Sequence, residues 1–173
     1  MKKITLREHR NLLQSNPNRY EAGYQSAKDN WVRHAYSYYR DPSSNRVEKR
    51  RLKEHLGLMA DLTFEAQNRR PLFEIDDKCF AWNSPRFFSD NFIRYEIGHI
   101  RPKNKGGLSI VSNLCFQSAR CNQHIQSALN IDDVLFLLGH HTSVRQRIES
   151  LLSLHTSTEW IDLENQLTQT CEQ

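Results

Sequence analysis

One stretch of the chain holds residue types suited to acid–base and metal chemistry on a phosphate. An imidazole with an ordinary pKa near ~6.5 can act as a general base at neutral pH. His99 follows an alternating apolar run at 92–97, which predicts a strand. Asn122 begins a segment, 122–129, that predicts a helix. A strand end and a helix start that meet across a tight loop would form a cradle for one metal ion and one scissile phosphate.

The segment between His99 and Asn122 has to bring these two residues together. Pro102 and then Gly106-Gly107 predict a polar turn, because glycine adopts positive φ angles without a steric penalty. The apolar run at 108–111 predicts the returning strand. The expected unit is therefore a strand, a turn, a second strand and a helix.

This unit resembles the HNH nucleases, the ββα-metal family. The resemblance rests on five features in the family's order and spacing: a His with an apolar residue and a Pro after it, a Gly-Gly turn, an Asn-Leu pair and a Cys-Asn pair at the helix start. Here they are His99-Ile100, Pro102, Gly106-Gly107, Asn113-Leu114 and Cys121-Asn122. The resemblance covers about residues 74–130 and implies a metal-dependent DNA endonuclease.

The resemblance also implies a role for each matched residue. His99 would be the general base, Asn113 would orient its imidazole, and Asn122 would be a metal ligand. The implied ion is Mg²⁺ or Mn²⁺, since a carboxamide oxygen suits a hard cation. Four basic residues of the same stretch would hold the phosphates that flank the cut: Arg101, Lys103, Lys105 and Arg120.

The chain departs from the family pattern just before the histidine. The family usually has an Asp or a His there as a metal ligand, whereas this chain has Gly98. Glu96 and Gly98 should share one face of the strand, about 6.6 Å apart. Glu96 is therefore expected to reach past the glycine and to supply the carboxylate. The alternative is that Glu96 is an ordinary surface residue and that the metal site is weakened.

The structural zinc of many HNH proteins is not expected here. Each of the two Cys-x-x-Cys pairs that would hold it has lost one cysteine. Trp82 stands in the pair that begins at Cys79, and Ser118 stands in the pair that ends at Cys121. Tetrahedral zinc needs four nitrogen or sulfur ligands, so we expect packing to replace the metal. The alternative is a zinc whose ligand set a nearby histidine completes.

The charge is unevenly distributed along the chain. The net charge is +7 over residues 1–70, +2 over 71–131 and −5 over 132–173. A polyanion is therefore expected to bind against the N-terminal and central regions, residues 1–131. A basic turn at the start of the helix predicted over 46–67 would contact the DNA backbone through Lys49, Arg50, Arg51 and Lys53. The alternative is a solvent-exposed helix face whose charges Glu48 and Glu54 partly balance.

The chain as a whole is expected to be of the α+β class, mostly helical around a central ββα-metal hairpin and helix. We divide it into a basic helical region at 1–70, the HNH-like core at 71–131 and acidic helices at 132–173, packed as one compact domain. An aromatic stripe in the first region, at 22–39, is expected to lie in the core. His34 has no partner at ligand spacing and is not expected to act in the site.

The sequence shows no long apolar run and no signal peptide, and its four cysteines are scattered. We therefore expect a cytoplasmic protein that does not bind membranes. The main hypothesis is an HNH endonuclease of restriction, phage defence or phage DNA processing, possible as a homodimer because one such centre cuts one strand. The alternatives are a nucleic-acid-binding scaffold with weakened catalysis and a partner-binding or inhibitor protein.

Overall fold

The computed structural model describes residues 7–8, 11, 15–74, 88–89, 92–118, 121–123, 129–138 and 140–171. In these ranges the chain forms five α-helices and four short strands. The helices are α2 (Arg19–Tyr39), α3 (Arg46–Ala66), α5 (Ile131–Leu138), α6 (Thr142–His155) and α7 (Thr158–Cys171). The strands are β1 (Phe88–Ser89), β2 (Phe92–Ile93), β3 (Tyr95–His99) and β4 (Leu114–Ser118).

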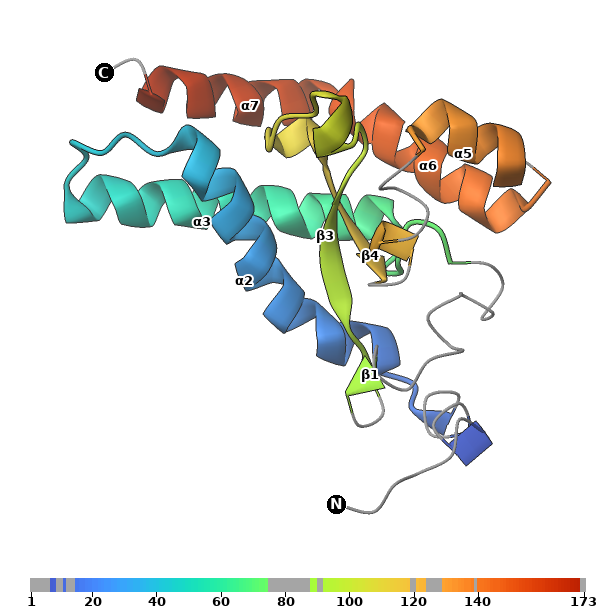
Figure 1. The fold of residues 1–173 in the computed structure, drawn as a ribbon. Coiled ribbons are helices and arrows are strands. Elements are labelled where there is room, and N and C mark those ends of the chain that lie inside the picture. The colour runs from blue at the N-terminus through green and yellow to red at the C-terminus, as the bar shows by residue number, and fades with distance from the viewer. Residues whose placement is uncertain are drawn as a thin grey trace.

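The turn-forming residues at 16–18 and 41–45 predict the limits of the two long N-terminal helices, and the structure confirms them. Residues 17 and 18 form a turn before α2, and residues 41–45 form the loop before α3. The start of α3 is fixed by a capping box, in which the Asn45 side chain accepts from the N–H of Glu48 and the Glu48 carboxylate accepts from the N–H of Asn45. Figure 1 shows α2 crossing α3, with α7 alongside α3.

The returning strand lies later in the chain than the sequence predicts. β3 pairs antiparallel with Leu114–Ser118, in a register that places Gly98 opposite Cys115 and His99 opposite Leu114. The predicted strand at 108–111 is wrong, since this segment is loop followed by a 3-10 turn at Val111–Asn113. The physical reason is burial on both faces: all five residues of β4 are buried, so the true strand lacks an alternating pattern, whereas Leu108 is 55% exposed.

The core forms where α2, α3 and β4 meet. Phe116 of β4 lies among the rings of Tyr24, Trp31, Phe64 and Tyr95, and the Tyr24 and Phe64 rings stack 3.9 Å apart. The predicted placement of the aromatic stripe of α2 in the core is therefore confirmed for Tyr24 and Trp31. The consequence for the site is that α2 packs against β3 and holds a second row of side chains beside it.

The expected mixture of helices and an antiparallel hairpin is confirmed for the described residues. One helix start differs from what the sequence predicts, since an Asp pair directly before an apolar run is typical of an N-cap. Asp132-Asp133 does not precede its helix but lies within the first turn of α5, and Asn130 and Asp133 exchange side-chain bonds with each other's main-chain N–H. In the part of the chain that the structure describes, none of the helices is long and apolar enough to cross a bilayer.

Candidate active site

The β3–β4 hairpin sets the positions of the two predicted functional residues of β3. His99 is the last residue of β3, and its imidazole lines a cavity of about 410 Å³. Ile97, two positions earlier on the same strand face, lines the cavity beside it. Asn122 lines the same cavity from the helical segment that begins at Cys121. The structure therefore brings His99 and Asn122 together, as the sequence predicts.

Glu96 lies close enough to Asn122 to share a ligand with it. The Asn122 Nδ2 donates to Glu96 Oε2 at 3.1 Å, and the Gln123 Nε2 donates to Glu96 Oε1 at 3.0 Å. Two side-chain amides thus hold the carboxylate at the start of the helical segment. Gln123 is a residue that the sequence reasoning missed; its position directly after Asn122 was the available signal.

The donor set at this point fits a hard cation that keeps most of its water. Glu96 supplies a carboxylate and Asn122 a carboxamide, and Mg²⁺ is commonly bound through one or two carboxylates together with waters and substrate phosphates. Within the described ranges, no group of three His, Cys, Asp or Glu side chains is arranged to hold a metal. The residues therefore fit a weakly held Mg²⁺ or Mn²⁺ whose other ligands come from water and substrate.

His99 is held in its neutral form at physiological pH. Burial above all, and then the charges of Lys103 and His34, lower the pKa of His99 from 6.5 to about 4. One ring nitrogen, Nε2, lies 3.0 Å from Ser109 Oγ. An unprotonated imidazole can accept a proton, so the ring is in the form that a general base requires.

Asn113 holds the loop rather than the imidazole. Its Oδ1 accepts from the N–H of Arg101 at 2.7 Å, and its Nδ2 donates to the carbonyls of Arg101 and Leu108. Its own carbonyl accepts from the N–H of Ile100 at 2.9 Å, directly after His99. Asn113 therefore positions His99 through the main chain of the loop.

The Gly-Gly turn of this loop is required by two different constraints. Gly106 has a φ of +81°, in the left-handed region, as the sequence predicts. Gly107 is needed for space, because a Cβ atom there would lie 1.8 Å from the carbonyl oxygen of Arg101. The loop can close over Asn113 only if position 107 has no side chain.

His34 of α2 is the main functional candidate that sequence reasoning missed. Its ring lies 6.3 Å from the ring of His99, nearly perpendicular to it, and it lines the same cavity. Burial above all, and then Lys103 and Arg33, lower the pKa of His34. Its position 65 residues before His99 gave no spacing signal, since only the packing of α2 on β3 brings the two rings together.

The basic residues of the loop divide into three situations. Lys103 lines the cavity beside His34 and His99. Lys105 instead forms an ion pair with Asp133 of α5 at 3.7 Å, and Arg101 donates from Nε to the carbonyl of Lys105. Arg120 lies outside the described residues. Of the described three, Lys103 is thus the one on the cavity wall.

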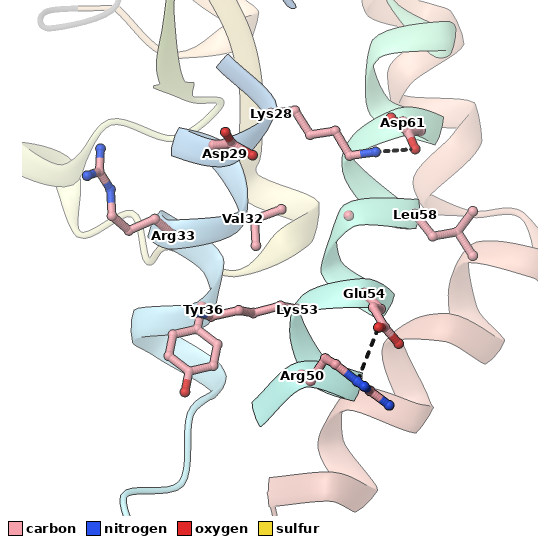
Figure 2. Close-up of a pocket in the computed structure, with 11 residues that line it drawn as sticks. Lys28, Asp29, Val32, Arg33, Tyr36, Arg50, Lys53, Glu54, Leu58 and Asp61 are labelled. Carbon is pink, nitrogen blue, oxygen red and sulfur yellow. Dashed lines mark hydrogen bonds and ion pairs between the residues drawn. The ribbon is translucent and has the colours of Figure 1, made fainter. Parts of the chain in front are cut away.

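The predicted basic turn of α3 is split between two sides of that helix. Arg50 and Lys53 line a groove between α2 and α3, shown in Figure 2. Arg51 lines a different hollow, between α3 and α7. Lys49 lies in the first turn of α3. These four side chains therefore do not form one continuous contact surface.

The remains of the zinc pairs are only partly described. Ser118 ends β4 and Cys121 begins the helical segment, and both are buried. Cys79 and Trp82 lie outside the described residues, as do most of the residues predicted to form the helix after Asn122. Comparison of the chain with family models, curated proteins and solved structures finds no match.

Proposed function

We propose that the chain is a metal-dependent endonuclease of the HNH type, which hydrolyses phosphodiester bonds of DNA in the cytoplasm. The observation that carries the proposal is that His99 and Asn122 line one cavity while Glu96 is hydrogen-bonded to Asn122. The proposed base and one proposed metal ligand thus line one cavity, and the second proposed ligand lies next to it. The setting is restriction, phage defence or phage DNA processing.

In the proposed reaction, His99 takes the proton of the attacking water, since its imidazole is neutral and lines the cavity. Glu96 and Asn122 would hold Mg²⁺ or Mn²⁺, which supplies Lewis acidity and stabilises the leaving oxygen when bound. Lys103 brings a positive charge to the cavity wall, where it offsets the charge of the phosphate. Asn113 fixes the loop that follows His99 and carries Lys103.

A second candidate function is a DNA-binding protein on the same scaffold with weakened catalysis. Two observations favour it. Gly98 offers no side-chain ligand next to His99, and both carboxylate oxygens of Glu96 already accept hydrogen bonds from amides. A metal ion would have to displace or share those bonds, which costs affinity.

The deciding experiment is a supercoiled-plasmid assay with the full chain in Mg²⁺, in Mn²⁺ and in EDTA. We expect cutting that depends on the metal and is lost in His99→Ala. The matched control is His140→Ala, because His140 is exposed, is not among the residues that line the cavity, and has its ring 3.9 Å from that of His141, tilted by 45°. A monomer should give nicked circles, whereas a homodimer should give linear DNA as well.

The other outcomes separate the alternatives. Salt-sensitive retention of the plasmid without cutting in either metal would support the weakened scaffold. Cutting by His99→Ala at the wild-type rate would contradict the assignment of the base. No retention at low salt would remove nucleic acid as the ligand and leave a partner-binding or inhibitor protein as the remaining explanation.

A further inference from the structure

The cavity has two chemically different sides. Asn122 lines one part of the cavity, and its amide donates to the Glu96 carboxylate, the anionic group proposed to bind a cation. His34 and Lys103 line the cavity with nitrogen groups that donate hydrogen bonds, which suit an anion. His99 lines the cavity together with both sets. A phosphodiester bound to a metal ion presents oxygen atoms that need such donors.

The position of His34 is fixed by a rigid element. Its neighbours Trp31 and Ala35 are fully buried under α2, and its own carbonyl accepts a hydrogen bond from Ser37 Oγ at 2.7 Å. The main chain that carries the half-buried ring is therefore held in place by the packing of α2. It lies 6.3 Å from the His99 ring, a separation that one phosphate group can bridge.

The charges that act on the two imidazoles are all positive. The pKa of His34 is lowered by burial first and then by Lys103 and Arg33, and the pKa of His99 by burial first and then by Lys103 and His34. No carboxylate of the described residues is among these causes. Such a half-buried group of nitrogen donors attracts an anion.

We propose that His34 is a second substrate-binding residue of the site, whose imidazole N–H, together with the Lys103 ammonium, binds the nonbridging oxygens of the scissile phosphate. The proposal rests on the proposed function for the identity of the substrate. It gives α2 a direct part in the reaction, in addition to its part in the core.

The first test is independent of catalysis. The full chain, labelled with ¹⁵N in its histidines, is titrated in EDTA with inorganic phosphate, and with chloride at the same ionic strength. We expect phosphate to shift the His34 and His99 imidazole resonances and to leave His140 in place. We expect Lys103→Ala to weaken this response. A His34 resonance that responds no more to phosphate than to chloride would overturn the proposal.

The second test separates hydrogen bonding from packing in the nicking assay. His34→Leu keeps bulk but removes the donor, whereas His34→Gln keeps an N–H group. A hydrogen bond to a charged group is worth about 10- to 100-fold in binding, so we expect His34→Leu to raise KM by about that factor and His34→Gln to recover most of it. Circular dichroism checks that both variants fold. Equal KM values for the two variants would overturn the proposal.

The outcomes keep the two proposals apart. If the wild type cuts but phosphate leaves His34 unmoved, the nuclease function stands and the role of His34 falls. If the wild type does not cut, the nuclease function falls and the phosphate titration alone decides whether His34 belongs to an anion site.

Discussion

Two of the hollows beside α2 differ in size, and the larger of the two is not the better candidate site. The groove between α2 and α3 has a volume of about 740 Å³, against about 410 Å³ for the cavity that His99 and Asn122 line. Figure 2 shows that the charges of the groove are largely paired across it or along it: Lys28 with Asp61 at 2.6 Å and Arg50 with Glu54 at 3.5 Å.

No carboxylate is among the described residues that line the cavity. Lys103 lowers the pKa of both imidazoles, after burial, and the neighbouring carboxylate of Glu96, bonded to Asn122, is held by amides that carry no charge. Groups whose charges are not cancelled by neighbours can act on a ligand, whereas paired charges mainly hold two helices together. Size alone would have pointed to the groove, and chemistry points to the cavity.

The largest expected difference between the two hollows concerns their carboxylates. Glu96→Ala should lower the rate of plasmid cutting by about 100-fold or more at fixed Mg²⁺, because it removes the only charged ligand proposed for the metal. A higher metal concentration should recover part of this loss. The rate is measured as nicking against Mg²⁺ concentration.

The matched control is Glu54→Ala, since Glu54 lies in the groove and its side chain is 66% exposed. It should cut within about twofold of the wild type, because an exposed pair contributes little. Equal losses in the two variants would mean that Glu96 has no special relation to the metal.

Most helices could be predicted from the sequence, because their signals are local. The break at 16–18, the loop at 41–45 and the apolar spacing of α3 are readable from neighbouring residues alone. The returning strand could not be predicted. Its identity depends on which segment is buried on both faces by α2 and α3, and the polar-apolar pattern at 108–111 imitates a strand that does not form.

The site could be predicted in part for the same reason. The approach of His99 to Asn122 follows from a strand, a tight glycine turn and a helix start that are close in sequence. The role of Asn113 at the loop main chain and the presence of His34 in the cavity depend on tertiary packing. Sequence spacing carries no information about a residue that a distant helix brings in.

A glycine of the loop that follows His99 and a glycine of the groove should respond to substitution in opposite directions. Gly107→Ala should lower the free energy of unfolding by about 1 to 3 kcal/mol, because its Cβ would overlap the carbonyl of Arg101 and the loop would have to move. Gly57→Ala in the groove should raise it by about 0.5 to 1 kcal/mol, since alanine favours a helix and its Cβ would meet only the flexible end of Lys28, at 3.4 Å.

Urea denaturation measures both glycine variants under the same conditions. A Gly107→Ala protein as stable as the wild type would show that the loop relaxes without cost. The nicking rate of this variant should also fall, because the same loop carries Lys103 and ends at Asn113.

Acid should lower the free energy of unfolding through His99, which lines the cavity, and not through the charged residues of the groove. The folded pKa of His99, about 4, lies below its ordinary value of 6.5, so the unfolded chain binds more protons between these pH values. The stability due to neutral His99 is therefore complete above pH ~6.5 and is lost as the pH falls towards about 4. After a discount for solvent screening, we expect the free energy of unfolding to fall by about 1 kcal/mol over this pH range through His99.

The measurement is urea denaturation at several pH values for the wild type and for His99→Gln. The free energy of unfolding of the variant should depend less steeply on pH than that of the wild type. His155, whose pKa is also lowered by burial to about 4, contributes equally to both proteins. Lys53→Ala in the groove should keep the wild-type slope. Parallel curves for wild type and His99→Gln would contradict the origin of the effect in the cavity.

The smallest effects are expected from the exposed cations of α3. Arg50→Ala should change the free energy of unfolding by less than about 0.5 kcal/mol, because the Arg50 side chain is 72% exposed in its pair with Glu54.

Lys53 extends over the ring of Tyr36 on the side of α3 that faces α2, the helix that carries His34. Lys53→Ala should therefore weaken DNA binding about two- to fivefold and reduce the salt dependence slightly. Arg51→Ala is the matched comparison, since Arg51 lines the hollow beside α7. This variant should bind DNA as tightly as the wild type. The affinities are measured by fluorescence anisotropy at several salt concentrations. If Arg51→Ala weakens binding more than Lys53→Ala, the DNA lies on the α7 side of α3, and the groove in Figure 2 has no part in binding.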